Sequence, residues 1–461
     1  MARSLSLNPP CRAHAAAIRQ LMCGAPPCFL TATALSLSFF ATAAPVLADT
    51  PGQGFDVIHY DLAVVPDAVG KAIAGREEIV LRITEEQVQH LTFSGSALSI
   101  EKASFDGHPV RAESIDGTLR FILPRPVSKG RIARLELTYQ GQPARGFVAQ
   151  DNLLYAAYFT CDWMICLQDA FADKATFSIA LQVPAGTNTL APGTLVSKRP
   201  MGGGQEEHTW RETRPYSAYL YGFAVGRFVH AGAGAQAYVS AVADTGELER
   251  RFAETAAMTD FLADKAGVPL PVERYSQLLV EGYEAQEAAT YSIIGRDALP
   301  GNGDDAAQSW AIVHELAHQW WGNLITCETL SEFWLNEGIT TFMTAAWKEH
   351  RYGRAAYDAE LDIARARLAK ARDAGFDKPL AWQGTYPSLG IRRAVQYSKG
   401  ALFMHALRQQ LGEDAFWAGL RRYSQTHAGG TVTSIDLQRA MEKESNRSLD
   451  PIFKTWVFGE P

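Results

Sequence analysis

His314-Glu-Leu-Ala-His-Gln-Trp-Trp-Gly-Asn-Leu-Ile-Thr326 is the stretch that decides the fold, and it begins with an HExxH motif. On a helix, His314 and His318 lie one turn apart on the same face, so both imidazoles can bind one metal ion. Glu315 lies one residue further round, where it can face a water molecule on that ion. The same letters also suit a helix with two partly exposed histidines and a salt-bridging glutamate, so the motif needs support from other residues.

Two further residues supply that support. Trp334-Leu-Asn-Glu-Gly338 follows His318, with eighteen residues between His318 and Glu337, and it opens a second apolar helix. The Glu337 carboxylate would complete a His, His, Glu set and leave the fourth position of a zinc ion for water. Tyr397 lies sixty residues further on, near the start of another helix. We therefore predict a zinc site with His314, His318 and Glu337 as metal ligands.

These residues resemble a known family. The stretch from His314 to Thr326, followed by Trp334 to Gly338, is similar to the zinc aminopeptidases of the gluzincin type, which are related to aminopeptidase N and leukotriene hydrolase. Asp173 to Phe177 resembles that family's β domain, and Leu449 to Phe453 resembles the end of its catalytic domain. The resemblance implies one zinc ion, an N-terminal β domain and a thermolysin-like catalytic domain, as in a short two-domain bacterial-type member. It also implies that Tyr397 is the catalytic tyrosine.

One segment departs from the family pattern. The family binds the substrate's free amino group with the Glu of a Gly-x-Met-Glu-Asn segment on an edge strand. The most similar segment in this chain is Glu284-Ala-Gln-Glu-Ala-Ala289. Glu287 alone keeps the family's identity, so Glu287 is the predicted amine-binding residue. The family's second amine-binding Gln or Glu would fall near Ala156, where the sequence offers neither. Glu281 or Glu284 could compensate, or both could be surface carboxylates.

The predicted reaction is hydrolysis of the N-terminal peptide bond of peptides by a metal-activated water. Glu315 would act as the general base, Tyr397 would stabilise the oxyanion, and Glu287 would pair with the α-ammonium group. Two alternatives stay open. A zinc endopeptidase or dipeptidase on the same site is favoured by the altered amine-binding segment, and a non-catalytic zinc-binding scaffold protein would need neither Glu315 nor Tyr397.

The chain divides into two halves by periodicity. Short alternating apolar runs fill residues 55–229, with Gly, Pro and Asp between them, and predict an all-β unit of sandwich or saddle type. Helical periods follow, with a short strand region around residues 277–295. The expected helices are 248–265, 306–324, 332–351, 355–374, 395–411, 414–425 and 434–445. We predict an α+β fold with a signal peptide at 1–48, an N-terminal β domain at 49–235 and a zinc peptidase domain at 236–461.

Composition excludes several classes of protein. Of 461 residues, 47% are hydrophobic and 20% are charged, which rules out an intrinsically disordered chain. A net charge of −7 without any basic run argues against binding to nucleic acid or to anionic membranes. We expect peptide substrates and no nucleic-acid partner, while the oligomeric state is not predicted. Since the chain ends soon after the zinc domain, we expect a two-domain enzyme with a comparatively open site.

Residues 1–48 are typical of an export signal. They contain three Arg and no acidic residue, an apolar stretch of sixteen residues from Phe29 to Ala44, and Val46-Leu-Ala48 before Asp49. Small residues at the first and third positions before the cut suit signal peptidase. A membrane anchor is the alternative, although true spans need about 20 residues. We predict a periplasmic or secreted protein with no stable membrane insertion after cleavage, and the net charge of −7 becomes −10 once those three Arg are removed.

Three cysteines follow the predicted leader. Cys161 and Cys166 are close enough in sequence to pair in an oxidising compartment, but their spacing alone does not decide whether they do. Cys327 is expected to be a small buried apolar residue.

Overall fold

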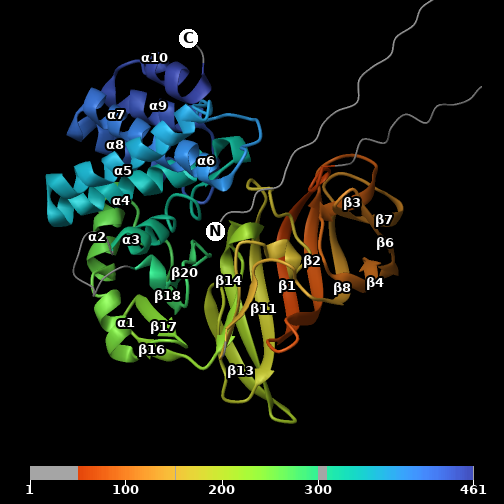
Figure 1. Ribbon diagram of the computed structural model, residues 1–461. Helices are drawn as coiled ribbons and strands as arrows, with labels where there is room; N and C mark the ends of the chain where they lie inside the picture. The colour runs from red at the N-terminus through yellow and green to blue at the C-terminus, as the bar shows by residue number, and fades with distance from the viewer. Residues whose placement is uncertain (1–49, 151, 300–308, 460–461) are drawn as a thin grey trace, which may run out of the picture. The chain divides into compact units, whose positions relative to one another are not determined.

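The structure is a computed structural model that describes residues 50–150, 152–299 and 309–459 (Figure 1). The predicted signal peptide at 1–48 lies outside the described residues. From Ala48 onward the chain forms one compact unit. Its N-terminal part is built from β-sheets and its C-terminal part is mainly helical, which confirms the predicted α+β fold class.

A long twisted sheet forms the larger part of the β domain. Its eight strands run in the order β13-β14-β11-β1-β2-β8-β4-β5, and β1 pairs with β11 in parallel and with β2 antiparallel. Alternate residues of β1 are buried, among them Tyr60, Leu62 and Val64, as expected for a sheet with one face in the core. The strand bounds are β1 (Phe55–Asp67), β2 (Ala72–Ile83), β4 (Ser99–Phe105), β5 (His108–Pro109), β8 (Ile132–Gly141), β11 (Lys174–Pro184), β13 (Thr194–Gly202) and β14 (Gln205–Ser217).

Two smaller sheets complete the β domain. One has the strand order β3-β7-β6 and the other β12-β15-β10-β9. Their strands are β3 (Val88–Ser94), β6 (Arg111–Ile115), β7 (Thr118–Val127), β9 (Phe147–Gln150), β10 (Leu153–Ala156), β12 (Asn188–Leu190) and β15 (Ala224–Gly226). Between β10 and β11, Cys161 and Cys166 form a disulfide, which their spacing alone left undecided. Cys327 is a free and buried thiol, as predicted.

A five-stranded sheet begins the second half of the chain. Its order is β16-β17-β18-β20-β19, with β17, β18 and β20 parallel and β19 antiparallel at the edge. All residues of β18 and β20 are buried, which is typical of strands covered on both faces. The border predicted between residues 235 and 236 falls between two paired strands, β16 and β17. The strands are β16 (Val229–Ala231), β17 (Gln236–Ser240), β18 (Tyr275–Val280), β19 (Ala285–Gln286) and β20 (Tyr291–Gly295).

Helices make up most of the rest, beside a parallel pair of short strands, β21 (Thr326–Cys327) and β22 (Thr431–Val432). Two of the expected helices are wrong in extent. The helix expected at 248–265 is divided into α1 and α2, and the helix expected at 306–324 ends at Ala317 as α3. The early end is explained by Gly322, whose φ of +132° lies outside the helical region and closes a turn through a hydrogen bond from its N–H to the Ile325 carbonyl. The helices are α1 (Thr245–Arg251), α2 (Thr255–Ala266), α3 (Ser309–Ala317), α4 (Trp334–Tyr352), α5 (Arg354–Asp373), α6 (Leu389–Arg393), α7 (Gly400–Leu411), α8 (Glu413–Thr426), α9 (Ser434–Ser445) and α10 (Asp450–Phe453).

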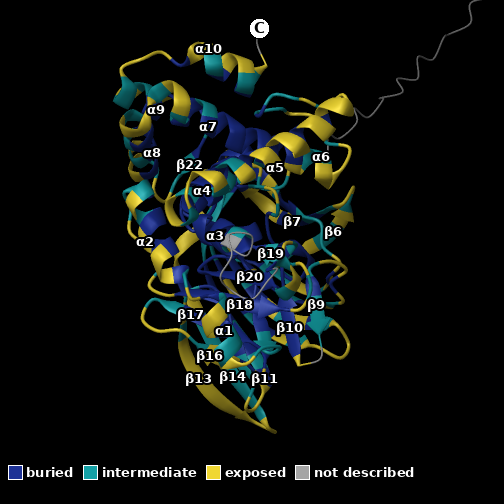
Figure 2. Ribbon diagram, turned by 60° about the vertical axis from the view of Figure 1, so that its left-hand side comes forward, coloured by how far each residue is buried: buried dark blue, intermediate teal, exposed yellow. Residues whose placement is uncertain are grey.

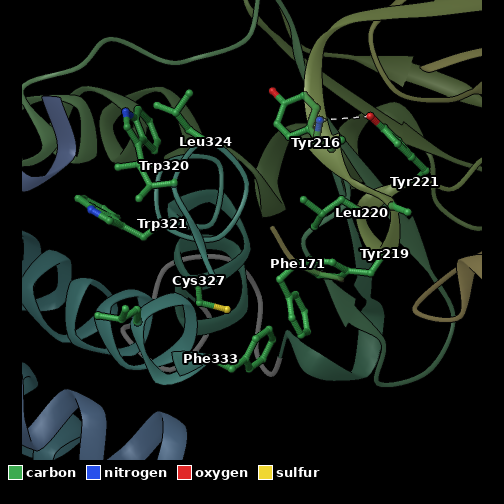
Figure 3. Packing of buried hydrophobic residues seen from close by; sticks show 14 of the residues in the cluster. Phe171, Tyr216, Tyr219, Leu220, Tyr221, Trp320, Trp321, Leu324, Cys327 and Phe333 are labelled. Atoms are coloured by element: carbon green, nitrogen blue, oxygen red, sulfur yellow. Dashed lines mark hydrogen bonds between the residues drawn. The ribbon is translucent and has the colours of Figure 1, made fainter. Parts of the chain in front are cut away.

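The two halves share one hydrophobic core. Phe171 of the β domain packs against Phe333, just before α4, with ring centroids 5.4 Å apart, and against Tyr219 at 5.3 Å (Figure 3). Figure 2 shows that α3 and the strands beneath it are buried, whereas α5 and α6 present exposed faces. Among the described residues, no helix is both long and apolar enough to cross a membrane.

Candidate metal centre and active site

The predicted ligands meet at the end of α3. The Nε2 atoms of His314 and His318 are 3.2 Å apart, and Oε2 of Glu337 lies 3.3 Å from the first and 3.4 Å from the second. All three residues are almost fully buried, at 2%, 1% and 3% exposure. Three ligand atoms therefore point at one place from two helices that are adjacent in space.

His318 is oriented by the turn that follows it. Its Nδ1 lies 2.9 Å from the Trp321 carbonyl and donates its proton there, so that in the neutral form of the ring the lone pair is on Nε2, the atom that would bind a metal. A Cβ on Gly322 would lie only 2.8 Å from this Nδ1. Gly322 is thus required twice, by its positive φ and by the close approach of the imidazole.

Two glycines bring Glu337 and Tyr397 to the same place. A Cβ on Gly338 would lie 2.8 Å from Cα of Gly400, so α4 and the start of α7 cross with their backbones in contact. This close crossing places the first turn of α4, with Glu337, beside η5 (Ala394–Lys399), the π-helical turn that carries Tyr397. Such turns are frequent at functional sites. Gly338, next to Glu337, and Gly400, three residues after Tyr397, therefore have a packing role.

Aromatic rings hold His314 in its orientation. The Tyr397 ring is nearly parallel to it, at 8° and 5.9 Å between centroids, and so is the Trp310 ring, at 12° and 5.0 Å. Trp310 stands one helical turn before His314 on α3, and sequence reasoning missed it. Only its spacing of four residues from a ligand could have pointed to it.

Burial controls the charges at this centre. It raises the pKa of Glu315 well above the usual range, and it lowers the pKa of His314. Burial also opposes the charged form of Glu337, but the charge of His318 and hydrogen bonds with both histidines hold the pKa of this carboxyl well below its usual range. The centre thus has an ionised ligand carboxylate beside a second carboxylate, Glu315, with a strong affinity for a proton.

Glu287 lies beside the ligands. Its carboxylate, a Glu315 oxygen and a His318 nitrogen all lie within 4.8 Å of one another, and burial raises its pKa. The carbonyls of Glu287 and Ala288 accept hydrogen bonds from Nδ2 of Asn323, at 3.2 and 3.3 Å. The turn after the HExxH helix therefore also fixes the predicted amine-binding residue.

Tyr158 occupies the region where the sequence offered no second amine-binding residue. Its φ is +62°, which is rare for a tyrosine. Its N–H donates to Oε1 of Gln286 at 3.0 Å, and its hydroxyl donates to the Ala285 carbonyl at 2.7 Å. Ala156 itself is buried in β10, and Gln168 donates to the Tyr158 carbonyl at 2.9 Å. Through these hydrogen bonds, Tyr158 of the β domain fixes the edge strand that precedes Glu287.

The two compensating carboxylates have different positions. Glu284 lines the same cavity as the ligands. Glu281 instead pairs with Arg296, with 3.0 Å between Oε1 and Nη1, on an exposed surface. Of the two, Glu284 is the one that a substrate in the cavity can reach.

These residues line one cavity of about 1230 Å³. The β domain contributes Tyr158, Phe171 and Tyr219 to its wall, and α5 and α6 contribute the opposite part. A volume of this size holds several residues of an extended peptide.

The donor set fits a zinc ion. The converging atoms are two imidazole nitrogens and one carboxylate oxygen, which is the three-ligand pattern of catalytic zinc sites. A hydrogen bond to the Trp321 carbonyl also fixes the tautomer of His318. A buried Glu315 Oε2 has no hydrogen-bond partner among the described residues, as expected of a carboxylate that faces a water molecule on such an ion.

Comparison with known proteins finds solved structures with a similar fold. The structure resembles an M1 zinc metallopeptidase from Deinococcus radiodurans, with a TM-score of 0.76, 24% identity and coverage of 89% of this chain and 95% of that one. The likeness extends to a mutant of that protein bound to a Tyr-Ser-Ala substrate, again with a TM-score of 0.76. At this identity, the comparison shows a shared two-domain fold.

Curated relatives are longer proteins. Aminopeptidase 2 of Candida albicans is 24% identical over 87% of this chain and 46% of its own length, and aminopeptidase N of Lactobacillus delbrueckii subsp. lactis is 23% identical over 88% and 51%. The chain thus spans about half the length of these relatives. Residues 251–456 match the family described as peptidase family M1 domain. This match and the aminopeptidase relatives confirm the resemblance predicted from the two motifs.

Proposed function

We propose that this protein is a zinc-dependent aminopeptidase that removes the N-terminal residue from peptides. The observation that carries the proposal is the position of Glu287. A buried carboxylate within reach of the general base and of a metal ligand can bind an α-ammonium group and place the first peptide bond at the ligands. Relatives named aminopeptidases support the same conclusion.

The roles of the residues follow from their positions. His314, His318 and Glu337 would hold the zinc ion, which supplies Lewis acidity to activate water and polarise the scissile carbonyl. Glu315, whose buried Oε2 has no hydrogen-bond partner among the described residues, would take a proton from water and pass it to the leaving amine nitrogen. The Tyr397 hydroxyl donates a hydrogen bond to the oxygen that gains negative charge in the transition state.

Substitution of the base and of the tyrosine tests this chemistry. We expect Glu315→Gln to lower kcat by about 10³-fold or more, and Tyr397→Phe by about 10²- to 10³-fold, since each removes a group used in the transition state. Zinc content, measured by atomic absorption, should stay near one ion per chain. Glu249→Gln, on the exposed surface of α1, is the matched control. Turnover close to that of the parent in either site variant would exclude that residue from the mechanism.

Blocked peptides separate an aminopeptidase from an endopeptidase. The parent should cleave peptides with a free amine and leave their N-acetylated forms intact, because an acetyl group removes the charge that Glu287 binds. Glu287→Ala should raise KM for the free-amine peptides. Equal cleavage of free and acetylated peptides would instead support the endopeptidase alternative, and zinc binding without hydrolysis of either would support the scaffold.

We also propose that the protein is exported, with cleavage after Ala48. The apolar stretch from Phe29 to Ala44 and the disulfide between Cys161 and Cys166 support a periplasmic or secreted location, since disulfides persist in oxidising compartments. Mass spectrometry of the mature N-terminus tests this, with Asp49 as the expected first residue. A mature chain that retains Phe29 to Ala44 would contradict it.

A further inference from the structure

The far wall of the active-site cavity is cationic. Arg367 and Lys370 on α5 and Arg392 and Arg393 on α6 all line it. Arg367 and Lys370 are three residues apart, so they lie on one face of α5, and the buried Ala371 lines the cavity beside them. Segment η5, which follows α6 directly, packs against α5. The four charges therefore gather on one wall.

Most of these charges lack an internal partner. In the described part of the chain, Arg367, Lys370 and Arg393 form no ion pair, although the surface around them is rich in such pairs, for example Arg365 with Asp362 and Arg372 with Asp377. Arg392 donates to Oε1 of Gln396 at 2.7 Å and lies over the Phe333 ring at 4.8 Å, neither of which neutralises it. Three cations thus face a cavity with their charge unpaired.

Apart from Asp169 of the β domain, the carboxylates of the cavity belong to the helices of the metal ligands and to the edge segment that contains β19. Glu284 and Glu287 follow β18 on the edge segment that contains β19, and Glu287 clusters with Glu315 and His318. Tyr397 instead stacks on His314, and Arg393 precedes it by about one turn. Figure 2 shows α5 and α6 above the level of α3 and β19 below it. The cavity therefore has a carboxylate pole on the edge segment with Glu284 and Glu287 and a guanidinium-rich pole on α5 and α6.

We propose that the cations of α5 and α6 bind the C-terminal carboxylate of short peptides, so that the enzyme prefers peptides whose two charged ends span the cavity. This inference rests on the proposed aminopeptidase function, because the carboxylate pole must hold the amine. Arg suits such a site, since its guanidinium can form two parallel hydrogen bonds with a carboxylate. A longer peptide carries its terminal charge out of the cavity and loses this contact.

Matched pairs of peptides test the proposal. Leu-Ala, Leu-Ala-Ala and longer members of the series are supplied as free acids and as C-terminal amides, and kcat/KM is measured for each. We expect the free acid to be preferred by about tenfold or more at one short length, as charge-assisted hydrogen bonds allow. The ratio should approach one in long peptides, and it should fall at high salt.

Variants locate the effect. Combined Arg367→Gln, Lys370→Gln and Arg393→Gln should bring the acid-to-amide ratio at that length close to one. Arg365→Gln on the same helix, whose side chain does not line the cavity, should keep the parent's ratio. All three cations are exposed, so circular dichroism and zinc content should match those of the parent.

Two different failures can be told apart. If the parent cleaves free-amine peptides but treats acids and amides alike at every length, the carboxylate site is wrong and the aminopeptidase stands. If no peptide is cleaved, the proposed function is wrong. Calorimetry with the zinc-loaded Glu315→Gln variant then measures whether the cations bind the C-terminal carboxylate of a peptide. Binding of acids about tenfold tighter than that of amides would keep the carboxylate site, and equal binding would overturn it.

Discussion

At the scale of single residues, the turn after the HExxH helix depends on one glycine. Gly322 has a positive φ, and any Cβ there would press on the Nδ1 of His318. We expect Gly322→Ala to weaken zinc binding by at least tenfold, because the imidazole must move from its hydrogen bond with Trp321. Gly429→Ala is the control, since Gly429 also has a positive φ but nothing lies within 4 Å of its Cβ position. Competition with a zinc chelator measures the difference, and equal zinc affinity in the two variants would contradict the steric argument.

A buried carboxyl group in the β domain predicts a pH dependence of stability. Glu77 accepts a hydrogen bond from the Ile165 N–H at 2.9 Å, and burial raises its pKa from 4.5 to about 8. Between these values the folded chain binds a proton that the unfolded chain releases, so this residue's contribution to stability falls as pH rises from 4.5 to 8. Glu77→Gln removes the titration.

The measurement compares free energies of unfolding in urea at pH 5 and pH 8. Relative to Glu77→Gln, the parent should lose up to about 4 kcal/mol across this interval. Glu78→Gln changes the next residue of β2, which forms an ion pair with Arg134 near the surface, and it should leave the pH dependence of the parent unchanged. A difference between parent and Glu77→Gln that is constant with pH would show that Glu77 keeps an ordinary pKa.

The sequence predicts the site best where residues lie close together along the chain, because local secondary structure then fixes their relative positions. One turn of helix separates His314 from His318, and local periodicity predicts this without tertiary information. Tyr158 is different, because its role depends on a positive φ and on contact with a strand 127 residues away in sequence. No periodicity carries such information, so this part of the site could not be predicted.

At the scale of elements, β11 is linked to the turn that follows α3. The partly buried Lys174 donates three hydrogen bonds, to the carbonyls of Asn323, Leu324 and Gly430, at 3.3, 3.0 and 2.9 Å. Asn323 in turn holds the carbonyls of Glu287 and Ala288. One strand of the β domain therefore positions the turn on which both a metal ligand and the amine-binding segment depend.

Replacement of this lysine tests the link. Lys174→Met keeps the length of the side chain and leaves three carbonyls without their donor, at a cost of about 1 to 3 kcal/mol for each group that stays buried and unpaired. We expect a lower Tm, and a KM for free-amine peptides that rises because Glu287 is displaced. Lys443→Met on α9 is the control, since the side chain of Lys443 is exposed. A lower Tm with unchanged KM would show that Lys174 stabilises the fold without positioning the site.

Element boundaries show the limits of periodicity. The apolar pattern of residues 306–324 continues past Ala317, because Trp320, Trp321 and Leu324 are buried in the core. These residues belong to a turn, and their burial comes from packing against other elements (Figure 3). An apolar pattern predicts which residues are buried, but the backbone that buries them is decided here by Gly322.

At the scale of the whole molecule, the β domain and the zinc domain should unfold together. The core is continuous through Phe171, Tyr219 and Phe333, and Lys174 adds hydrogen bonds across the same boundary. Zinc binds only the folded state, so it stabilises every part of the chain that unfolds in the same transition as the site. Removal of zinc by a chelator should therefore lower a single Tm, and added zinc, unlike added magnesium, should restore it.

Hydrogen exchange can show whether this coupling crosses the domain boundary. In the parent, loss of zinc should speed exchange in the slowest amides of β1 and β2 as well as in those of α4, because global unfolding exposes them all. Phe171→Ala removes the aromatic contact with Phe333 and should weaken this coupling, so that zinc protects α4 more than β1. Ile132→Ala, which truncates an exposed side chain on β8, is the control and should behave as the parent does. If zinc leaves the exchange of β1 and β2 unchanged in the parent, the domains unfold independently, and the shared core does not make them one cooperative unit.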